Sequence, residues 1–239
     1  MIRRLILATA GVAALAACSE KQPPAPERTV LTPGAGDYHY PEYSRDGKQL
    51  AFRGTHDGKM RIWVAGTDGS DARPITPDAN WTQAPFWSPD GQFIAYASDL
   101  SGPPDIYVVA ATGGEPRRLT SEPSLEVLPQ WSPDGRRITY AANRRGNYDL
   151  LSMPVEGGVP DTIAATDAEE AGRWSPDGTR IAIWRRTKEK STIWVRTLDG
   201  GAERQLTTEG REQPVEWSPD GREILYVSDR TGKRDIWAV

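Results

Sequence analysis

Short apolar runs, each bounded by glycine, aspartate or proline, recur from residue 28 to the end of the chain. One example starts with "FIAYAS" at 93–98 and a turn-like segment. The run "DIYVVA" at 105–110, a "TGG" turn and "PRRLT" at 116–120 follow. The runs are rich in β-branched and aromatic residues, as β-strands are, and no window shows a sustained helical period. The pattern predicts an all-β fold of short antiparallel strands.

A pentapeptide marks each repeat of this pattern. Trp-Ser-Pro-Asp-Gly occurs at 87–91, 131–135, 174–178 and 217–221, and a diverged copy, Tyr-Ser-Arg-Asp-Gly, occupies 43–47. The lead residues of successive copies are 44, 44, 43 and 43 residues apart. A fixed period of this length, filled by four short strands, is typical of a β-propeller blade.

The full repeat, "WSPDG…IAY.S…G..DIY…..GG…RLT", resembles the TolB-type or PD40 propeller repeat, which is WD40-like. The resemblance covers residues 28–239 and implies a propeller of about five four-stranded blades. The namesake of the family has six blades and a separate α/β domain, so its role carries over to this chain only in part.

The last repeat ends at "DIWAV" (235–239) and lacks the outer strand that "RLT" provides in the second repeat. The missing pattern stands at the front of the body, as "RTVLT" at 28–32. We therefore expect residues 28–32 to complete the last blade, an arrangement that would protect exposed strand edges. The alternative is that the chain is a fragment of a larger propeller.

The first 27 residues follow a different pattern. Residues 1–17 hold two arginines and a short apolar run, which predicts an export signal rather than a membrane span. The segment Leu15-Ala16-Ala17-Cys18 resembles the lipobox of bacterial lipoproteins, which implies cleavage before Cys18 and acylation of its thiol. Residues 18–27 are polar and proline-rich, and we expect them to form an extended tether. An ordinary secretory signal is the alternative.

Ser19 stands where lipoproteins kept in the inner membrane have aspartate, so the resemblance implies an outer-membrane anchor on the periplasmic side. Cys18 is the single cysteine, which excludes an intrachain disulfide. We expect the propeller, residues 28–239, to be a monomer attached to the membrane through this lipid.

The charge of the chain argues against a nucleic-acid partner. The 29 basic and 33 acidic residues give a net charge of −4, and the chain has no run of lysine and arginine. Motifs of hydrolases, zinc proteases and phosphate-binding loops are absent from the sequence. Only His39 and His56 are available for a triad or a histidine metal centre. We therefore predict no catalytic residues, no metal and no cofactor.

The repeated aspartates are candidates for a metal site, a binding ring or a turn. Serine, proline, aspartate and glycine in this order favour a tight turn, because proline presets φ and glycine accepts a positive φ. A cation needs about six oxygen ligands, which one carboxylate on each separate blade does not supply. We interpret the following as structural turn residues: Asp46, Asp90, Asp134, Asp177 and Asp220. The repeated tryptophans are interpreted as wedges between blades, with a sugar-stacking platform as the alternative.

Function is expected where the repeats differ. The strand that leads to each repeated aromatic should be innermost, and the residue immediately before that aromatic is of mixed type among the blades. These candidates are Glu42, Phe86, Gln130, Arg173 and Glu216. An excess of acid further up the same strands would attract a cation or a basic partner segment. These acids are Glu126, Glu169, Glu170 and Glu212. The alternative is a merely solvated rim.

These features favour a non-catalytic lipoprotein of the cell envelope, whose propeller acts as a scaffold that binds a protein or peptide, as the TolB resemblance implies. Two alternatives stay open. One is a propeller that binds a glycan or another small ligand, and the other is a propeller fragment related to prolyl-oligopeptidase-type enzymes.

Overall fold

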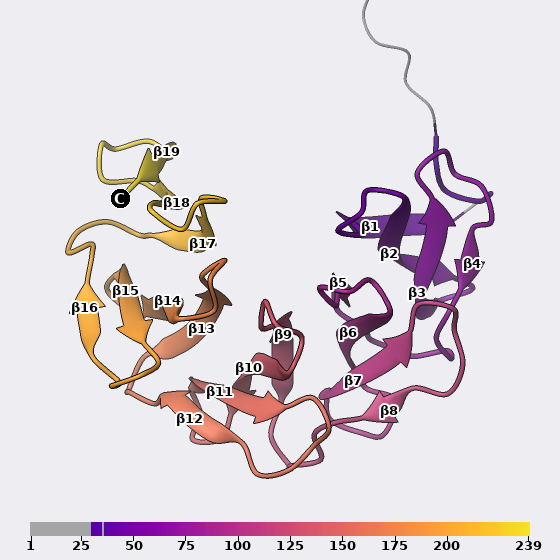
Figure 1. The fold of residues 1–239 in the computed structure, drawn as a ribbon, viewed down its shortest axis with the longest axis horizontal. Helices are drawn as coiled ribbons and strands as arrows, with labels where there is room; N and C mark the ends of the chain where they lie inside the picture. Colours follow the sequence, from indigo (N-terminus) through magenta and orange to yellow (C-terminus); the bar gives the residue numbers. More distant parts are fainter. Residues whose placement is uncertain (1–29, 35) are drawn as a thin grey trace, which may run out of the picture. The chain divides into compact units, whose positions relative to one another are not determined.

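The computed structural model describes residues 30–34 and 36–239, and residues 31–239 form one compact unit. Nineteen strands in this part of the chain build five antiparallel sheets, which follow one another around a common centre from indigo to yellow in Figure 1. The described residues form no helix, and therefore none that is long and apolar enough to cross a membrane. The all-β propeller of five blades is confirmed.

The blades follow the order of the chain, and within each blade the strands run outward in sequence. The first blade comprises β1 (Asp37–Tyr43), β2 (Gln49–His56), β3 (Lys59–Gly66) and β4 (Arg73–Pro74). The second comprises β5 (Phe86–Trp87), β6 (Phe93–Ser98), β7 (Asp105–Ala110) and β8 (Arg117–Arg118). The third comprises β9 (Glu126–Trp131), β10 (Arg137–Asn143), β11 (Tyr148–Pro154) and β12 (Asp161–Ala164).

The fourth blade comprises β13 (Glu169–Trp174), β14 (Arg180–Arg186), β15 (Ser191–Thr197) and β16 (Glu203–Gln205). The last comprises β17 (Gln213–Trp217), β18 (Ile224–Ser228) and β19 (Asp235–Ala238). Apolar side chains of facing sheets form the core between neighbouring blades. For example, Ile62 and Val64 of the first blade pack with Ile94 and Tyr96 of the second.

The repeated pentapeptide forms the same turn five times. In the third copy the Ser132 hydroxyl lies 2.6 Å from Asp134 Oδ1, and the backbone N–H of Arg136 donates to the same oxygen at 3.0 Å. Gly135 ends the turn with φ of 70°, a conformation that glycine adopts without strain. These hydrogen bonds favour the ionised carboxylate, and in the fourth copy Ser175 and the Thr179 amide lower the pKa of Asp177 to about 2.

Three of the four repeated tryptophans tie their blade to the one before it, whereas Trp174 Nε1 is buried without a hydrogen-bond partner among the described residues. The indole Nε1 of Trp87, Trp131 and Trp217 donates to a backbone carbonyl of the preceding blade, at 3.1, 2.9 and 3.1 Å. The acceptors are the residues that precede the lead aromatics of the previous inner strands: Glu42, Phe86 and Arg173. Each indole therefore fixes its neighbour's inner strand relative to its own.

The expected fourth strand of the last blade is not found among the described residues, because β17, β18 and β19 form a three-stranded sheet. Val30 to Thr32 carry no strand, and Arg28 and Thr29 lie outside the described residues. Leu31 nevertheless packs against the first blade, in a cluster of Leu50, Phe52, Trp63 and Ala65. Closure of the last blade by residues 28–32 stays a prediction.

Three inner strands contain a bulge that the fourth blade lacks. The pairing of β9 with β10 shifts between Thr139 and Ala141, whereas β13 pairs with β14 without interruption. The extra residue places Tyr40 and Leu128 in the left-handed region, with φ of 55° and 57°. The period of 43 residues at the fourth copy reflects the missing bulge residue.

Candidate functional site

The structure brings together four of the five residues that precede the lead aromatics. The Arg173 guanidinium carbon lies 5.7 Å from the centre of the Phe86 ring, and Arg173 Nε lies 3.8 Å from Glu216 Oε2. Glu42 lies near enough to feel the charges of both Arg173 and Glu216. We call these four residues the central cluster. They come from the first, second, fourth and fifth blades, so the cluster exists only when the blades assemble.

Burial shifts the pKa values of two residues in the central cluster. Burial raises the pKa of Glu42 to about 7, although the backbone amide of Trp87 and the charge of Arg173 act against this shift. Trp87 N donates to Glu42 Oε2 at 3.1 Å. Burial likewise lowers the pKa of Arg173, whereas Glu216 is largely exposed. Glu42 therefore changes its charge close to neutral pH.

Gln130, the fifth residue of this set, does not join these contacts. Its backbone carbonyl accepts a 3.5 Å hydrogen bond from Thr139, and its side-chain nitrogen is buried without a partner among the described residues.

An apolar recess adjoins Arg173. A cavity of about 90 Å³ is lined by Leu128, Ala171, Gly172, Arg173, Trp184 and Val215. A second cavity of about 210 Å³ shares Leu128, Ala171 and Trp184 with the first. Leu128 is 38% exposed and Tyr40, the other bulge residue, is 55% exposed. The centre of the propeller thus presents exposed apolar side chains beside an arginine.

The sequence did not identify Tyr40, Leu128 and Trp184 as parts of this surface. A partial signal existed only for Leu128, because the repeat from Trp131 to Trp174, whose inner strand has no bulge, is one residue shorter than the repeat that contains Leu128. Trp184 lies on β14, a second strand whose core pattern gave no indication that it also borders a cavity.

The acids further up the inner strands do not form the open negative rim that the sequence suggested. Glu126, Glu170 and Glu212 are buried, with at most 1% of each residue exposed. Arg185 pairs with Glu170 at 2.5 Å, and Arg230 pairs with Glu212 at 3.0 Å. These carboxylates are buried within the blades, so they do not present an acidic surface to a partner.

The missing bulge also changes which acid of the fourth blade is buried. Glu170 faces Arg185 in the register where Glu126 faces Ala142 in the third blade. Glu169, which matches Glu126 by distance from the lead tryptophan, is partly exposed and pairs with Arg186. Counting back from the lead tryptophan therefore selects Glu169, whereas Glu170 occupies the buried position that Glu126 has in the third blade. Burial raises the pKa of Glu126 to about 7, while the Thr120 and Ser124 hydroxyls oppose the shift.

The two histidines lie in the first blade. His39 lies 3.0 Å from Asp37, and His56 shares a 2.6 Å hydrogen bond with the Tyr38 hydroxyl. Among residues 30–34 and 36–239, no group of three or more histidine, cysteine, aspartate or glutamate side chains lies close enough together to hold a metal ion.

Comparison with known proteins agrees with this architecture. The family described as the TolB beta propeller domain matches residues 40–239. The chain belongs to the TolB β-propeller family. No curated protein sequence matches the chain.

Solved TolB structures superpose on most of this family member. The protein assigned as TolB from Agrobacterium tumefaciens shares 25% identity, with a TM-score of 0.70 over 85% of this chain and 76% of that one. TolB from Acinetobacter baumannii shares 20% identity, with a TM-score of 0.71 over 85% of this chain. The present chain spans only 52% of that second protein.

The same fold occurs in enzymes. Oligogalacturonate lyase from Vibrio parahaemolyticus has a TM-score of 0.72 at 13% identity, over 89% of this chain and 68% of the lyase. Identity at this level shows a common fold alone, so the TolB-family propeller described here is not assigned a reaction by this likeness.

Glu42 gives a direct test of the central cluster. Following the Trp87 backbone amide by NMR, we expect its chemical shift to titrate with a midpoint near pH 7, because this amide donates to the Glu42 carboxylate. The Glu42→Gln variant should remove the transition and leave the amide signals of the other tryptophans unchanged. The pKa of an unfolded glutamate is about 4.3, so the raised folded value makes the native state less stable as the pH rises through 7. A midpoint below about pH 5 would contradict this assignment.

Proposed function

We propose that this chain is a non-catalytic scaffold of the cell envelope that binds a protein or peptide segment at the centre of its propeller. One observation carries the proposal. The residues that differ from blade to blade meet there, as Arg173 contacts Phe86 and Glu216 from three separate blades. The turns and wedges that the repeats share serve the architecture instead.

The central surface suits a segment that has both apolar and charged side chains. Arg173 is 30% exposed, Glu216 is 73% exposed, and the recess lined by Leu128 and Val215 lies beside them. An apolar side chain in the recess would remove the exposed surface of Leu128 from water. The charges of Arg173 and Glu216 would select the orientation of the segment, because unpaired charges at an interface are costly.

The proposed location rests on the first residues of the chain, which lie outside the described part. An export signal at 1–17, acylation of Cys18 and a tether at 18–27 would place the propeller in the periplasm, attached to the outer membrane. The membership in the TolB propeller family supports an envelope role. We propose a monomer with a protein partner and without nucleic acid.

A site-specific crosslinking experiment tests the scaffold. A photoreactive phenylalanine analogue at Leu128 should capture a discrete envelope polypeptide in living cells, and the Arg173→Glu exchange should abolish the adduct. The same analogue at Phe93, which is 41% exposed on β6, is the matched control. Adducts that are absent at Leu128, or identical at both positions, would overturn the proposal. Quenching of tryptophan fluorescence by neutral envelope glycans would favour the glycan-binding alternative.

A further inference from the structure

A groove between the fourth and last blades gathers positive charge from separate parts of the sequence. Its cavity has a volume of about 270 Å³, and one wall is the turn between β14 and β15. Segments that precede β17 and β19 form the other wall. The cationic side chains on these walls are Arg186, Lys188, Lys190, Arg211 and Arg234.

Four of these five cations lack an ionic partner. Arg186 pairs with Glu169, but no ion pair within the described residues involves Lys188, Lys190, Arg211 or Arg234. All four are exposed. The whole chain has a net charge of −4, so the surface charge at this groove is opposite in sign to that of the protein as a whole.

The acids that line the groove offset only part of this positive charge. Glu212 is buried and pairs with Arg230 at 3.0 Å. Asp229 Oδ1 accepts the backbone N–H of Arg211 at 2.9 Å, which holds that segment in place. Glu189 lies exposed at the tip of the turn.

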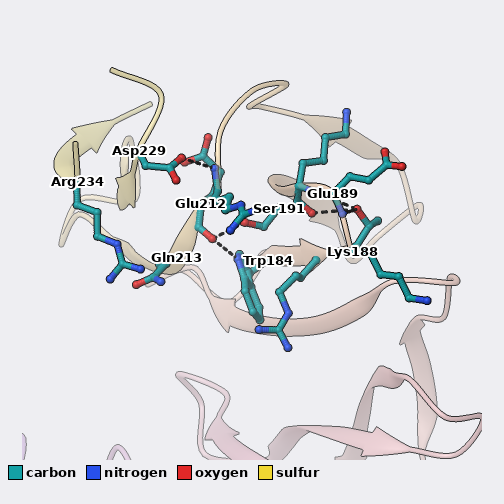
Figure 2. Close-up of a pocket in the computed structure, with 12 residues that line it drawn as sticks. Trp184, Lys188, Glu189, Ser191, Glu212, Gln213, Asp229 and Arg234 are labelled. Carbon is teal, nitrogen blue, oxygen red and sulfur yellow. Dashed lines mark hydrogen bonds between the residues drawn. The ribbon is translucent and has the colours of Figure 1, made fainter. Parts of the chain in front are cut away.

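The floor of the groove is fixed before any ligand arrives. The Glu212 carbonyl accepts hydrogen bonds from Ser191 Oγ at 2.6 Å and from Trp184 Nε1 at 2.7 Å. Ser191 also forms a parallel bridge with Arg211, which joins the two walls. Figure 2 shows Arg234 and Lys188 on opposite sides of the groove, with Trp184 and Gln213 between them. A ligand in this groove would meet cations on both sides of a rigid base.

We propose that this groove binds a small oligoanion, a molecule with two or more phosphate or carboxylate groups. Guanidinium groups bind both kinds of oxyanion through paired hydrogen bonds, and separated cations favour a ligand with separated charges. The volume lies just below the range of about 300–1,000 Å³ of typical small-molecule sites, which suits a compact ligand. None of the four residues of the central cluster lines this groove. Its expected ligand is an anion, whereas the acids of the inner strands had suggested a cation or a basic segment.

Calorimetric titration of the full chain in non-ionic detergent tests the proposal, with tripolyphosphate and citrate as probes and maltotriose as the uncharged comparison. We expect at least one of the two anions to bind at about 50 mM salt, with at least tenfold weaker binding at about 200 mM. Binding of tripolyphosphate alone identifies phosphate as the preferred group, and binding of citrate alone identifies carboxylate. The proposal would be overturned if neither anion gave a heat of binding, or if maltotriose gave the same heat as the anions.

Matched charge removals locate the site. The triple variant Lys188→Gln, Lys190→Gln, Arg234→Gln should weaken binding by at least about tenfold. The control Lys48→Gln, Arg136→Gln, Arg222→Gln removes the same charge from three exposed pentapeptide turns and should bind within about twofold of the parent chain.

Hydrogen exchange of the unaltered chain does not depend on any variant folding. Bound probe should protect residues 186–191 and 211–213. Equal losses in both triple variants, or protection confined to other segments, would show general attraction to the surface and reject the groove.

Discussion

Replacing Arg185 by methionine is expected to lower the free energy of unfolding by about 3 kcal/mol at neutral pH. Arg185 Nε lies 2.5 Å from Glu170 Oε1, and the Glu170 side chain has no exposed surface. The other oxygen of this carboxylate, Oε2, has no partner among the described residues. Removal of the guanidinium therefore leaves a charge buried in the blade, with hydrogen bonds from Thr166, whose hydroxyl lies 3.1 Å away, to stabilise it.

The neighbouring residue provides the control. Arg186 pairs with Glu169 one step along the same strands, but the two side chains are 53% and 37% exposed. Solvent screens such a pair, so Arg186→Met should change the free energy of unfolding by less than about 1 kcal/mol. Urea unfolding of the two variants, followed by tryptophan fluorescence, gives the comparison. Equal effects would mean that burial does not govern this pair.

The pH dependence adds a signature that loss of packing would not show. Burial already raises the pKa of Glu170, and loss of Arg185 should raise it further. The folded variant then holds a proton that the unfolded chain, with a glutamate pKa of about 4.3, releases. The free energy of unfolding of the variant must therefore rise as the pH falls from about 7 toward 5. The difference in free energy of unfolding between the parent and the variant should shrink over the same range. Arg185 also lies over the Trp194 ring, 4.6 Å from its centre, and pairs with Glu203 at 3.3 Å. A loss of stability that is constant with pH would assign the effect to these contacts instead.

The sequence was sufficient for the architecture because the repeated features are local. Ser132, Asp134 and Gly135 form their turn within one pentapeptide, and each copy repeats the same short-range hydrogen bonds. The wedge role of Trp131 required only the repeat spacing, since its indole reaches Phe86, the residue before the lead aromatic of the preceding inner strand. The central cluster was predictable in part, because residues at one repeat position of different blades face a common centre.

The sequence was insufficient where a single residue changes the register or where distant segments meet. A one-residue difference in the fourth repeat exchanges Glu169 and Glu170 between exposed and buried positions. The groove cations illustrate the second case, because Lys188, Arg211 and Arg234 are scattered in the sequence and form no basic run. The ion pairs of Glu170 and Glu212 were equally hidden, since their partners Arg185 and Arg230 are 15 and 18 residues away in the sequence.

Closure of the last blade is best judged from a contact that three other blades share. A Thr hydroxyl of the outer segment accepts the backbone N–H of an isoleucine, at 2.9, 2.8 and 2.9 Å for Ile62, Ile106 and Ile193. The residue before that threonine donates its own N–H to the carbonyl of the same isoleucine at 2.8 Å in each case. Those three isoleucines are fully buried.

Among the described residues, the last blade contains the isoleucine but no threonine that accepts its N–H. Ile236 occupies the corresponding position and is 77% exposed. Leu31 and Thr32 have the matching residue types, and Leu31 already packs on the first blade as Ile75 packs on the second. If residues 28–32 close the ring, we expect Leu31 and Thr32 to bind Ile236 as Ile75 and Thr76 bind Ile62.

Substitution of Leu31 by aspartate is therefore expected to lower the free energy of unfolding by about 2–3 kcal/mol and to release the last blade. Val30 is 84% exposed, so Val30→Asp is the matched control and should be nearly neutral. Loss of stability alone would follow from the contacts of Leu31 with Leu50 and Trp63.

Hydrogen exchange at the Ile236 amide separates the two explanations for the effect of Leu31→Asp. If residues 28–32 close the ring, this amide should exchange as slowly as that of Ile193 in the parent chain and much faster in Leu31→Asp, with Ile62 still protected. Rapid exchange at Ile236 in the parent chain would mean that the edge of β19 is free. The apolar face formed by Leu225 and Ile236 would then be available to a strand from another source, because unpaired backbone groups at a sheet edge readily accept one.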